Sequence, residues 1–167
     1  MALFRNQAKG EPSILDRLID ENPDLAQESN DQHGLSLDEI RENIGRDLEA
    51  LLNTRISWLD IPERFPRVSD SIVAYGIPDL NNVVLDSRRS VDWLRDRIAE
   101  SISRFDKRLS RVMVRVESLD SETHQLKLRI DAVLAVDPEP IAVHYVPFLD
   151  FVRREFKISR SQSDVRG

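Results

Sequence analysis

The hydrophobic residues between Ser36 and Arg55 recur at steps of three and four positions, a spacing that predicts an amphipathic helix. Ser36 and Glu39 have the spacing of a capping box, which marks the start of a helix. Gly45 lies inside this helix, where glycine costs about 1 kcal/mol relative to alanine. Either close packing against a neighbour or local flexibility accounts for it. The predicted apolar stripe contains Leu37, Ile40, Ile44, Leu48, Leu51 and Leu52.

A second helix is predicted to begin at Asp86 or Ser87 and to end near Phe105, with charged residues on its other faces. Its apolar stripe contains Val91, Leu94, Ile98, Ile102 and Phe105. The stretch between the two helices, residues 56–86, holds three prolines and Gly76 and therefore cannot be one regular element. A long irregular segment of this kind is typical of a binding surface. Its apolar residues predict that it packs against the domain: Ile72, Val73, Tyr75, Ile77 and Leu80.

Two stretches downstream, residues 111–116 and 126–134, alternate between apolar and polar positions. This period of two predicts half-buried strands, and the polar residues 118–124 between them predict a hairpin. Residues 141–148 form a predicted third strand. Because proline has no backbone N–H, Pro147 predicts that this strand either lies at an edge of the sheet or ends there. Phe156 and Ile158 predict a short final strand.

These elements predict an α+β fold, with two main helices packed on one face of a small antiparallel β-sheet and a long irregular loop between the helices. The length of 167 residues suits one domain. We assign that domain to residues 35–158. Residues 1–34 are predicted to be a tail with a short helix near 14–21, and residues 159–167 a disordered tail.

Composition argues against several classes of function. The chain has no cysteine, which excludes disulfides, thiol nucleophiles and cysteine metal sites. Its three histidines are far apart, and no nucleotide-binding or hydrolase motif is present. No apolar run approaches the roughly 20 residues that span a bilayer. We therefore expect a cytoplasmic protein without membrane insertion, and we expect no catalytic residues, metal site or cofactor.

Charge is distributed unevenly along the chain. The net charge is −6, yet residues 11–49 carry a balance of −9 and residues 88–115 a balance of +5. Clustered arginine can neutralise phosphate. However, acidic residues interleave with these arginines, and no nucleic-acid-binding signature is present. Contact with another protein suits the pattern better, since arginine pairs well with carboxylates at interfaces.

The string RDLEALLNTR, residues 46–55, resembles the signature segment of the TssE family, small baseplate subunits of type VI secretion systems related to the baseplate wedge proteins of contractile phage tails. The string SIVAYGIPDL, residues 71–80, is similar to a second TssE segment, which usually has Asn where this chain has Ala74. The resemblance implies a structural protein that joins the TssF and TssG wedge and templates the TssB and TssC sheath by strand addition. TssK is a further partner within the baseplate.

A third similarity lies in the sequence FDKRL, residues 105–109, where the second helix gives way to the first long strand. The family typically carries Glu-Pro-Arg here, a motif that contacts the helical core bundle of the larger baseplate subunits. Asp106 matches the acid and Arg108 the arginine, while Lys107 replaces the proline. The resemblance implies that Asp106, Lys107, Arg108 and Leu109, together with Arg55, contact partners. From the pattern alone, an exposed charged turn is the alternative.

Other functions stay open at this stage. The nearest is a wedge protein of a phage tail or of another contractile injection machine. A cell-wall muramidase needs two carboxylates about 5 to 9 Å apart. The chain has 30 acidic residues, so such a pair would arise by chance. An RNA-binding module is the remaining alternative, and its affinity would fall steeply with salt.

Overall fold

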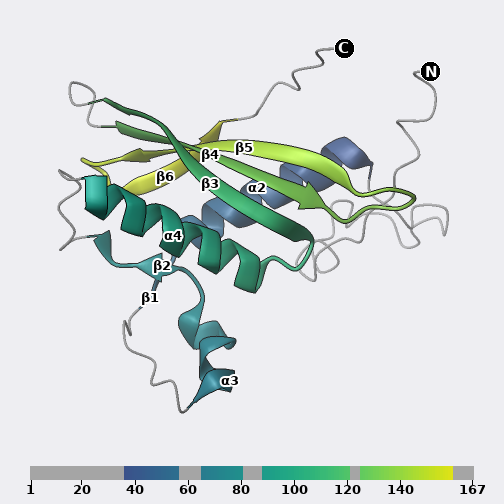
Figure 1. Cartoon of the computed structure of the whole chain (residues 1–167), viewed down its shortest axis with the longest axis horizontal. Coiled ribbons are helices and arrows are strands. Elements are labelled where there is room, and N and C mark those ends of the chain that lie inside the picture. The colour runs from purple at the N-terminus through teal and green to yellow at the C-terminus, as the bar shows by residue number, and fades with distance from the viewer. Residues whose placement is uncertain (1–35, 57–64, 81–87, 121–124, 160–167) are drawn as a thin grey trace, which may run out of the picture.

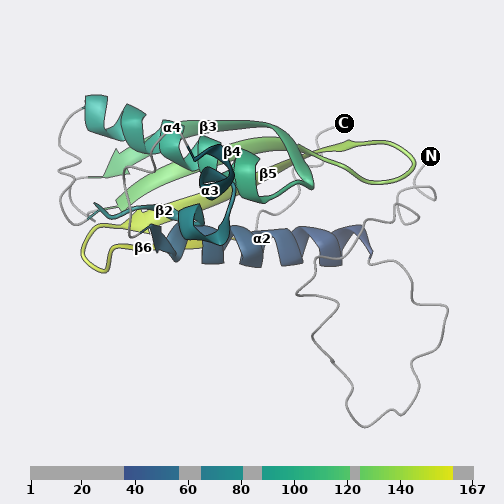
Figure 2. The ribbon, with the colours of Figure 1, turned by 90° about the horizontal axis from the view of Figure 1, so that it is seen from below.

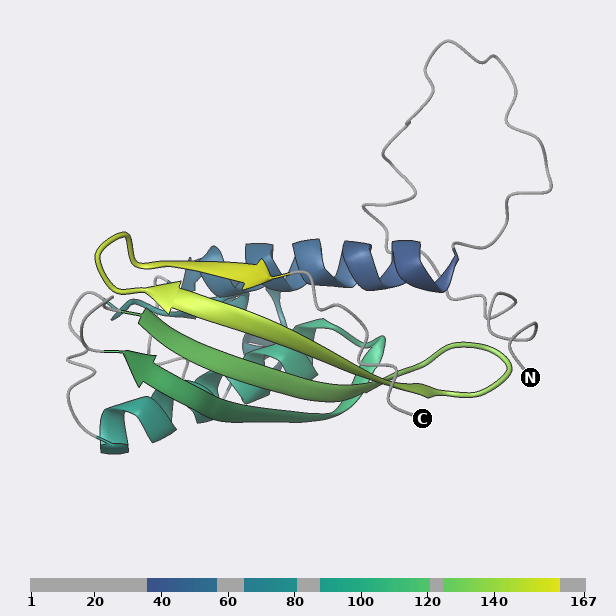
Figure 3. The same ribbon diagram turned by 90° about the horizontal axis from the view of Figure 1, so that it is seen from above.

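Two helices cover one face of a four-stranded antiparallel sheet (Figure 1). The computed structural model describes residues 36–56, 65–80, 88–120 and 125–159. The helices are α2 (Leu37–Asn53) and α4 (Arg88–Phe105). The sheet contains β3 (Leu109–Asp120), β4 (Gln125–Leu134), β5 (Ile141–Asp150) and β6 (Glu155–Ser159). The predicted α+β fold is therefore confirmed. Figure 3 shows the opposite face of the sheet, on which no described helix lies.

Helix α2 begins where the sequence predicts. The backbone N–H of Ser36 donates to Glu39 Oε2 at 2.7 Å, and the backbone N–H of Glu39 donates to Ser36 Oγ at 3.3 Å, which completes the capping box. Hydrogen bonds from the side chain and from the backbone N–H of Ser36 lower the pKa of Glu39, because they favour the charged carboxylate. Five residues of the predicted apolar stripe are buried: Ile40, Ile44, Leu48, Leu51 and Leu52.

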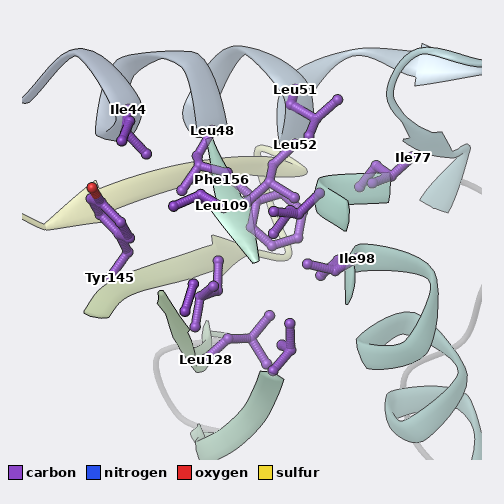
Figure 4. Close-up of a cluster of buried hydrophobic side chains, with 14 of the residues drawn as sticks. Ile44, Leu48, Leu51, Leu52, Ile77, Ile98, Leu109, Leu128, Tyr145 and Phe156 are labelled. Carbon is purple, nitrogen blue, oxygen red and sulfur yellow. The ribbon is translucent and has the colours of Figure 1, made fainter. Parts of the chain in front are cut away.

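The core lies between the two helices and the sheet. Figure 4 shows side chains of α2, among them Leu48 and Leu52, directed toward Phe156 of β6 and Leu109 of β3. Ile98 of α4 and Leu128 of β4 complete the same cluster and are fully buried. Every second residue of β4, from Leu126 to Leu134, points into this core. The period-two pattern in the sequence thus marks the face of β4 that the helices cover.

The four strands follow one another as a meander, in the order β3-β4-β5-β6. The prediction that the third strand lies at an edge or ends at Pro147 is wrong, because β5 lies between β4 and β6 and continues to Asp150. The pairing between β4 and β5 is interrupted between Phe148 and Tyr145. Pro147 lies in this gap, where β4 requires no hydrogen bond from its backbone nitrogen. Ser159 belongs to β6, so the predicted tail does not begin there.

The segment between the helices contains short elements that the sequence did not predict. They are β1 (Arg55–Ile56), α3 (Pro66–Ser69), η2 (Ile72–Ala74) and β2 (Ile77–Pro78), and β1 pairs with β2 in parallel. Ile77 is buried, but Ile72 is 87% exposed and Val73 51% exposed. The prediction that this segment packs against the domain therefore holds for Tyr75, Ile77 and Leu80, which are buried or partly buried, and is wrong for Ile72 and Val73. Figure 1 shows the reason, since α3 and the turn after it stand away from the sheet.

Gly45 of α2 faces the ring of Tyr145 on β5. A Cβ added at Gly45 would lie 3.7 Å from Tyr145 Cε1 and 3.9 Å from Cδ1, which is ordinary van der Waals contact. We therefore expect Gly45→Ala to stabilise the protein by about 0.5 to 1 kcal/mol, because alanine removes the helix-propensity penalty without a clash. Thermal unfolding of the two proteins measures the difference. A loss of stability would mean that the Tyr145 ring cannot tolerate the methyl group.

Two predictions fall on residues outside the described part of the chain: the short helix near 14–21, and the tail from residue 160 onward. In the ranges that are described, no helix has the length and apolar character that crossing a membrane requires.

Candidate functional site

The turn between α4 and β3 is built around the carboxylate of Asp106. The backbone N–H of Asp106 donates to Ile102 O at 2.9 Å, and the backbone N–H of Leu109 donates to Asp106 O at 3.2 Å. The carboxylate accepts three hydrogen bonds from Arg108: from the backbone N–H at 3.0 Å, from Nε at 2.9 Å and from Nη2 at 2.8 Å. Asp106 thus closes the turn with its own side chain.

Arg108 extends this network to the other helix. Its Nη2 lies 2.7 Å from Asp47 Oδ2 on α2, and the side chains of Arg108, Asp47 and Asp106 are only 19%, 20% and 10% exposed. Burial alone would lower the pKa of Arg108. The hydrogen bonds and negative charges of Asp106 and Asp47 outweigh burial and raise the pKa above its usual range. We call Asp47, Asp106 and Arg108 the junction triad.

The remaining predicted residues at this turn have different surroundings. Leu109 is buried in the core, between the helices and the sheet. Lys107 is exposed, and among the described residues it makes no hydrogen bond or ion pair. The turn is charged, as the sequence indicates, but Asp106 and Arg108 bind each other, and of its three charged residues only Lys107 is exposed.

Arg55 lies apart from this turn and contacts two backbone carbonyls. Its Nη1 donates to Leu52 O at 2.7 Å, and its Nη2 donates to Arg154 O at 2.6 Å. Burial lowers the pKa of Arg55, and the negative charge of Asp79 opposes that shift. The guanidinium therefore joins the end of α2 to the turn between β5 and β6.

The two edges of the sheet differ in the groups they offer. Helix α2 runs beside β6 (Figures 2 and 3), and its side chains bind the outer edge of that strand. Asn53 Nδ2 donates to Phe156 O at 2.9 Å, and Phe156 N–H donates to Asn53 Oδ1 at 2.8 Å. Ile158 N–H donates to Glu49 Oε2 at 3.0 Å. Asn53 and Glu49 thus take the place of a neighbouring strand.

Strand β3 forms the other edge. Within the described ranges, no strand pairs with the side of β3 that faces away from β4, and no side chain binds its backbone there between Val112 and Leu119. The pairing with β4 shifts register between Ser110 and Met113 and again between Val116 and Ser118. Arg111, inside the first shift, has a positive φ of 52° and an exposed side chain.

Sequence reasoning missed Asp47, Asn53 and Glu49, although all three lie in or beside the string RDLEALLNTR. The available signal was that these polar residues flank the buried residues of the α2 stripe. No local pattern could name their partners, since Asp47 and Arg108 are 61 positions apart and Asn53 and Phe156 are 103 apart. For metals, the described residues contain no group of three or more histidine or acidic side chains that could hold an ion.

Comparison with known proteins gives one family. The model of the family described as baseplate wedge protein gp25 matches residues 38–139, more than half of the chain. The matched range includes α2, α4, the junction triad and strands β3 and β4. No curated protein and no solved structure matches the chain.

Proposed function

The chain belongs to the gp25 baseplate wedge family, and from this premise we propose that it serves as the TssE-type subunit of a type VI secretion system baseplate. Family membership gives it a structural role of the baseplate-wedge type and contact with other baseplate proteins. The finer proposal is that it joins TssF and TssG, with TssK in the same assembly, and templates the TssB and TssC sheath in the cytoplasm. This role requires no catalysis.

The observation that carries the proposal is the family match over residues 38–139, which includes the α4–β3 junction. Where the family has Glu-Pro-Arg, the acid and the arginine of this chain bind each other, and the arginine, Arg108, also binds Asp47. This network holds the turn in one conformation, so the stiffness that proline would give is supplied by hydrogen bonds. Lys107 then extends from a fixed turn and is available to a carboxylate of a baseplate partner.

Sheath templating is supported by the unpaired edge of the sheet. An open edge offers N–H and C=O groups that an extended segment of another chain can bind, and strand addition is a recurring mode of protein recognition. Helix α2 and its contacts with β6 hold the sheet rigidly. A preformed sheet lowers the entropic cost of ordering the incoming segment.

Co-purification of the tagged protein from its native cells, followed by mass spectrometry, tests the proposal. We expect TssF, TssG and TssK together with TssB and TssC. Recovery of phage-tail proteins instead would support the alternative, a wedge protein of a phage tail or another contractile injection machine. Recovery of nucleic acid, or of no baseplate protein, would contradict the proposal.

Lys107→Glu tests the junction as the wedge contact. We expect this charge reversal to lower the recovery of TssF and TssG about tenfold and to leave thermal unfolding unchanged, because Lys107 is exposed and makes no hydrogen bond or ion pair with a described residue. Lys157→Glu is the matched control, since Lys157 is also exposed and lies on β6, at the edge of the sheet opposite β3. Equal loss of TssF and TssG in both variants would show a general charge effect and no specific contact.

A further inference from the structure

The segment that contains α3 and η2 carries a concentration of exposed apolar side chains. We call residues 65–75 the arm, which stands away from the sheet (Figure 1). Single exposed apolar residues are common on protein surfaces, but several within a few positions mark a contact with another molecule. The exposed apolar residues of the arm are Phe65, Val68, Ile72 and Val73.

The arm is fastened to the C-terminal part of α4. Arg104 Nη1 donates to Ser69 O at 3.3 Å, and Arg104 Nε lies 3.8 Å from Asp70 Oδ1. At the end of the arm, the ring of Tyr75 packs edge-on against Phe105, with the ring centroids 5.3 Å apart. The arm therefore presents its apolar side chains from a preformed support, which lowers the entropic cost of binding.

The base of the arm adjoins the junction triad. Phe105, which Tyr75 contacts, immediately precedes Asp106 and lies two positions before Lys107. Burial raises the pKa of Tyr75, and the nearby negative charges of Asp47 and Asp106 raise it further. The arm therefore joins the domain beside the turn that carries Lys107.

The charged residues around the arm define the chemistry of its partner. The acids of α3 and of the adjoining part of α4 already have arginine neighbours, since Asp70 lies beside Arg104 and Glu100 is shared by two arginines of α4. Arg67 is exposed and, like Lys107, makes no hydrogen bond or ion pair with a described residue. The charge that remains without a partner is positive, so carboxylates on the partner would complement it.

We propose that the arm docks on the TssF–TssG wedge, which receives Phe65, Ile72 and Val73 in an apolar groove with carboxylates at its rim. A short projecting helix fits a groove of this kind. The carboxylates of the rim face Arg67 and Lys107, so the apolar contact is continuous with the contact at the junction. This inference rests on the proposed function, which supplies the wedge as partner.

Ile72→Asp tests the arm in the full-length protein, tagged and purified from its native cells. We expect recovery of TssF and TssG to fall about tenfold, because the groove would have to bury a carboxylate without a partner. Thermal unfolding should not change, since the Ile72 side chain is 87% exposed. Val152→Asp is the matched control, because Val152 is 78% exposed and lies in the turn between β5 and β6. Full recovery from Ile72→Asp, or equal loss in both variants, would overturn the inference.

Photo-crosslinking from position 72 gives a second test that keeps the side chain apolar. With an apolar photo-reactive residue at position 72, and at position 152 as the control, we expect crosslinks to TssF or TssG from position 72 alone. Crosslinks from position 72 only to a sheath subunit or to a second copy of this chain would overturn the inference, as would their absence while TssF and TssG still co-purify. Failure of the unaltered protein to recover TssF and TssG would instead contradict the proposed function, and this inference with it.

Discussion

Gly76→Ala is expected to lower the free energy of unfolding by at least about 3 kcal/mol. The same substitution at Gly45 is expected to have a smaller effect of opposite sign. Gly76 has a φ of +117°, a conformation that side chains rarely adopt. A Cβ there would also meet backbone and side-chain atoms of Thr54, its carbonyl oxygen closest of all. Neither strand of the small parallel pair can move away, since β1 continues directly from α2.

The contacts around Gly76 explain why the strain cannot relax. Ile77 N–H donates to Thr54 O at 2.9 Å, and Ser101 Oγ of α4 donates to Gly76 O at 2.6 Å. Moving Gly76 away from Thr54 would break both bonds and expose Ile77, which is fully buried. The residue therefore fixes the connecting segment both to the end of α2 and to the C-terminal part of α4.

Thermal unfolding checks this expectation, with Gly45→Ala as the matched control. At about 2 to 4 °C per kcal/mol for a protein of this size, the Gly76 variant should unfold at least about 6 °C lower, and the Gly45 variant slightly higher. A Gly76→Ala protein as stable as the original would show that the connecting segment can shift to accept a side chain at low cost.

Sequence patterns predicted the elements whose cause is local. The capping box at Ser36 and the apolar stripe of α2 are read within one helix, and the alternation along β4 is read within one strand. Pro147 is misleading because a missing N–H in a strand usually indicates an edge of the sheet. In the structure the ladder between β4 and β5 lapses at that point, so an interior strand accommodates the proline.

The candidate site could be predicted only in part, for a related reason. The resemblance drew attention to Asp106 and Arg108, but whether their charges face a partner or each other depends on Asp47, which lies on another helix. The difference between the two sheet edges likewise depends on Asn53 and Glu49 of α2 reaching β6. Contacts between residues so far apart in the sequence leave no periodic pattern.

The second large effect is expected at the junction triad. Asp106→Ala should lower the free energy of unfolding by about 2 to 4 kcal/mol, because it leaves Arg108 largely buried with Asp47 as its remaining carboxylate. The turn also loses the acceptor for the backbone N–H of Arg108. This expectation replaces the one that the sequence suggests, in which an exposed charged pair could be removed without a change in unfolding.

An exposed ion pair of the same chain supplies the control. Asp38 and Arg41 approach to 3.3 Å on α2, but the Asp38 side chain is 91% exposed. Asp38→Ala should therefore change the free energy of unfolding by no more than about 0.5 kcal/mol. Denaturant unfolding of Asp106→Ala and Asp38→Ala measures the two effects. Adding Asp47→Ala and the variant that combines it with Asp106→Ala gives the coupling free energy between Asp47 and Asp106 through Arg108.

These stability measurements decide how the binding experiments are interpreted. If Asp106→Ala loses TssF and TssG together with stability, while Lys107→Glu loses them at full stability, the triad shapes the turn and Lys107 contacts the partner. If Asp106→Ala unfolds like the original protein yet no longer binds, its carboxylate serves the partner directly. In that case Asp106 must exchange its intramolecular bonds to Arg108 for a bond to the partner when the baseplate assembles.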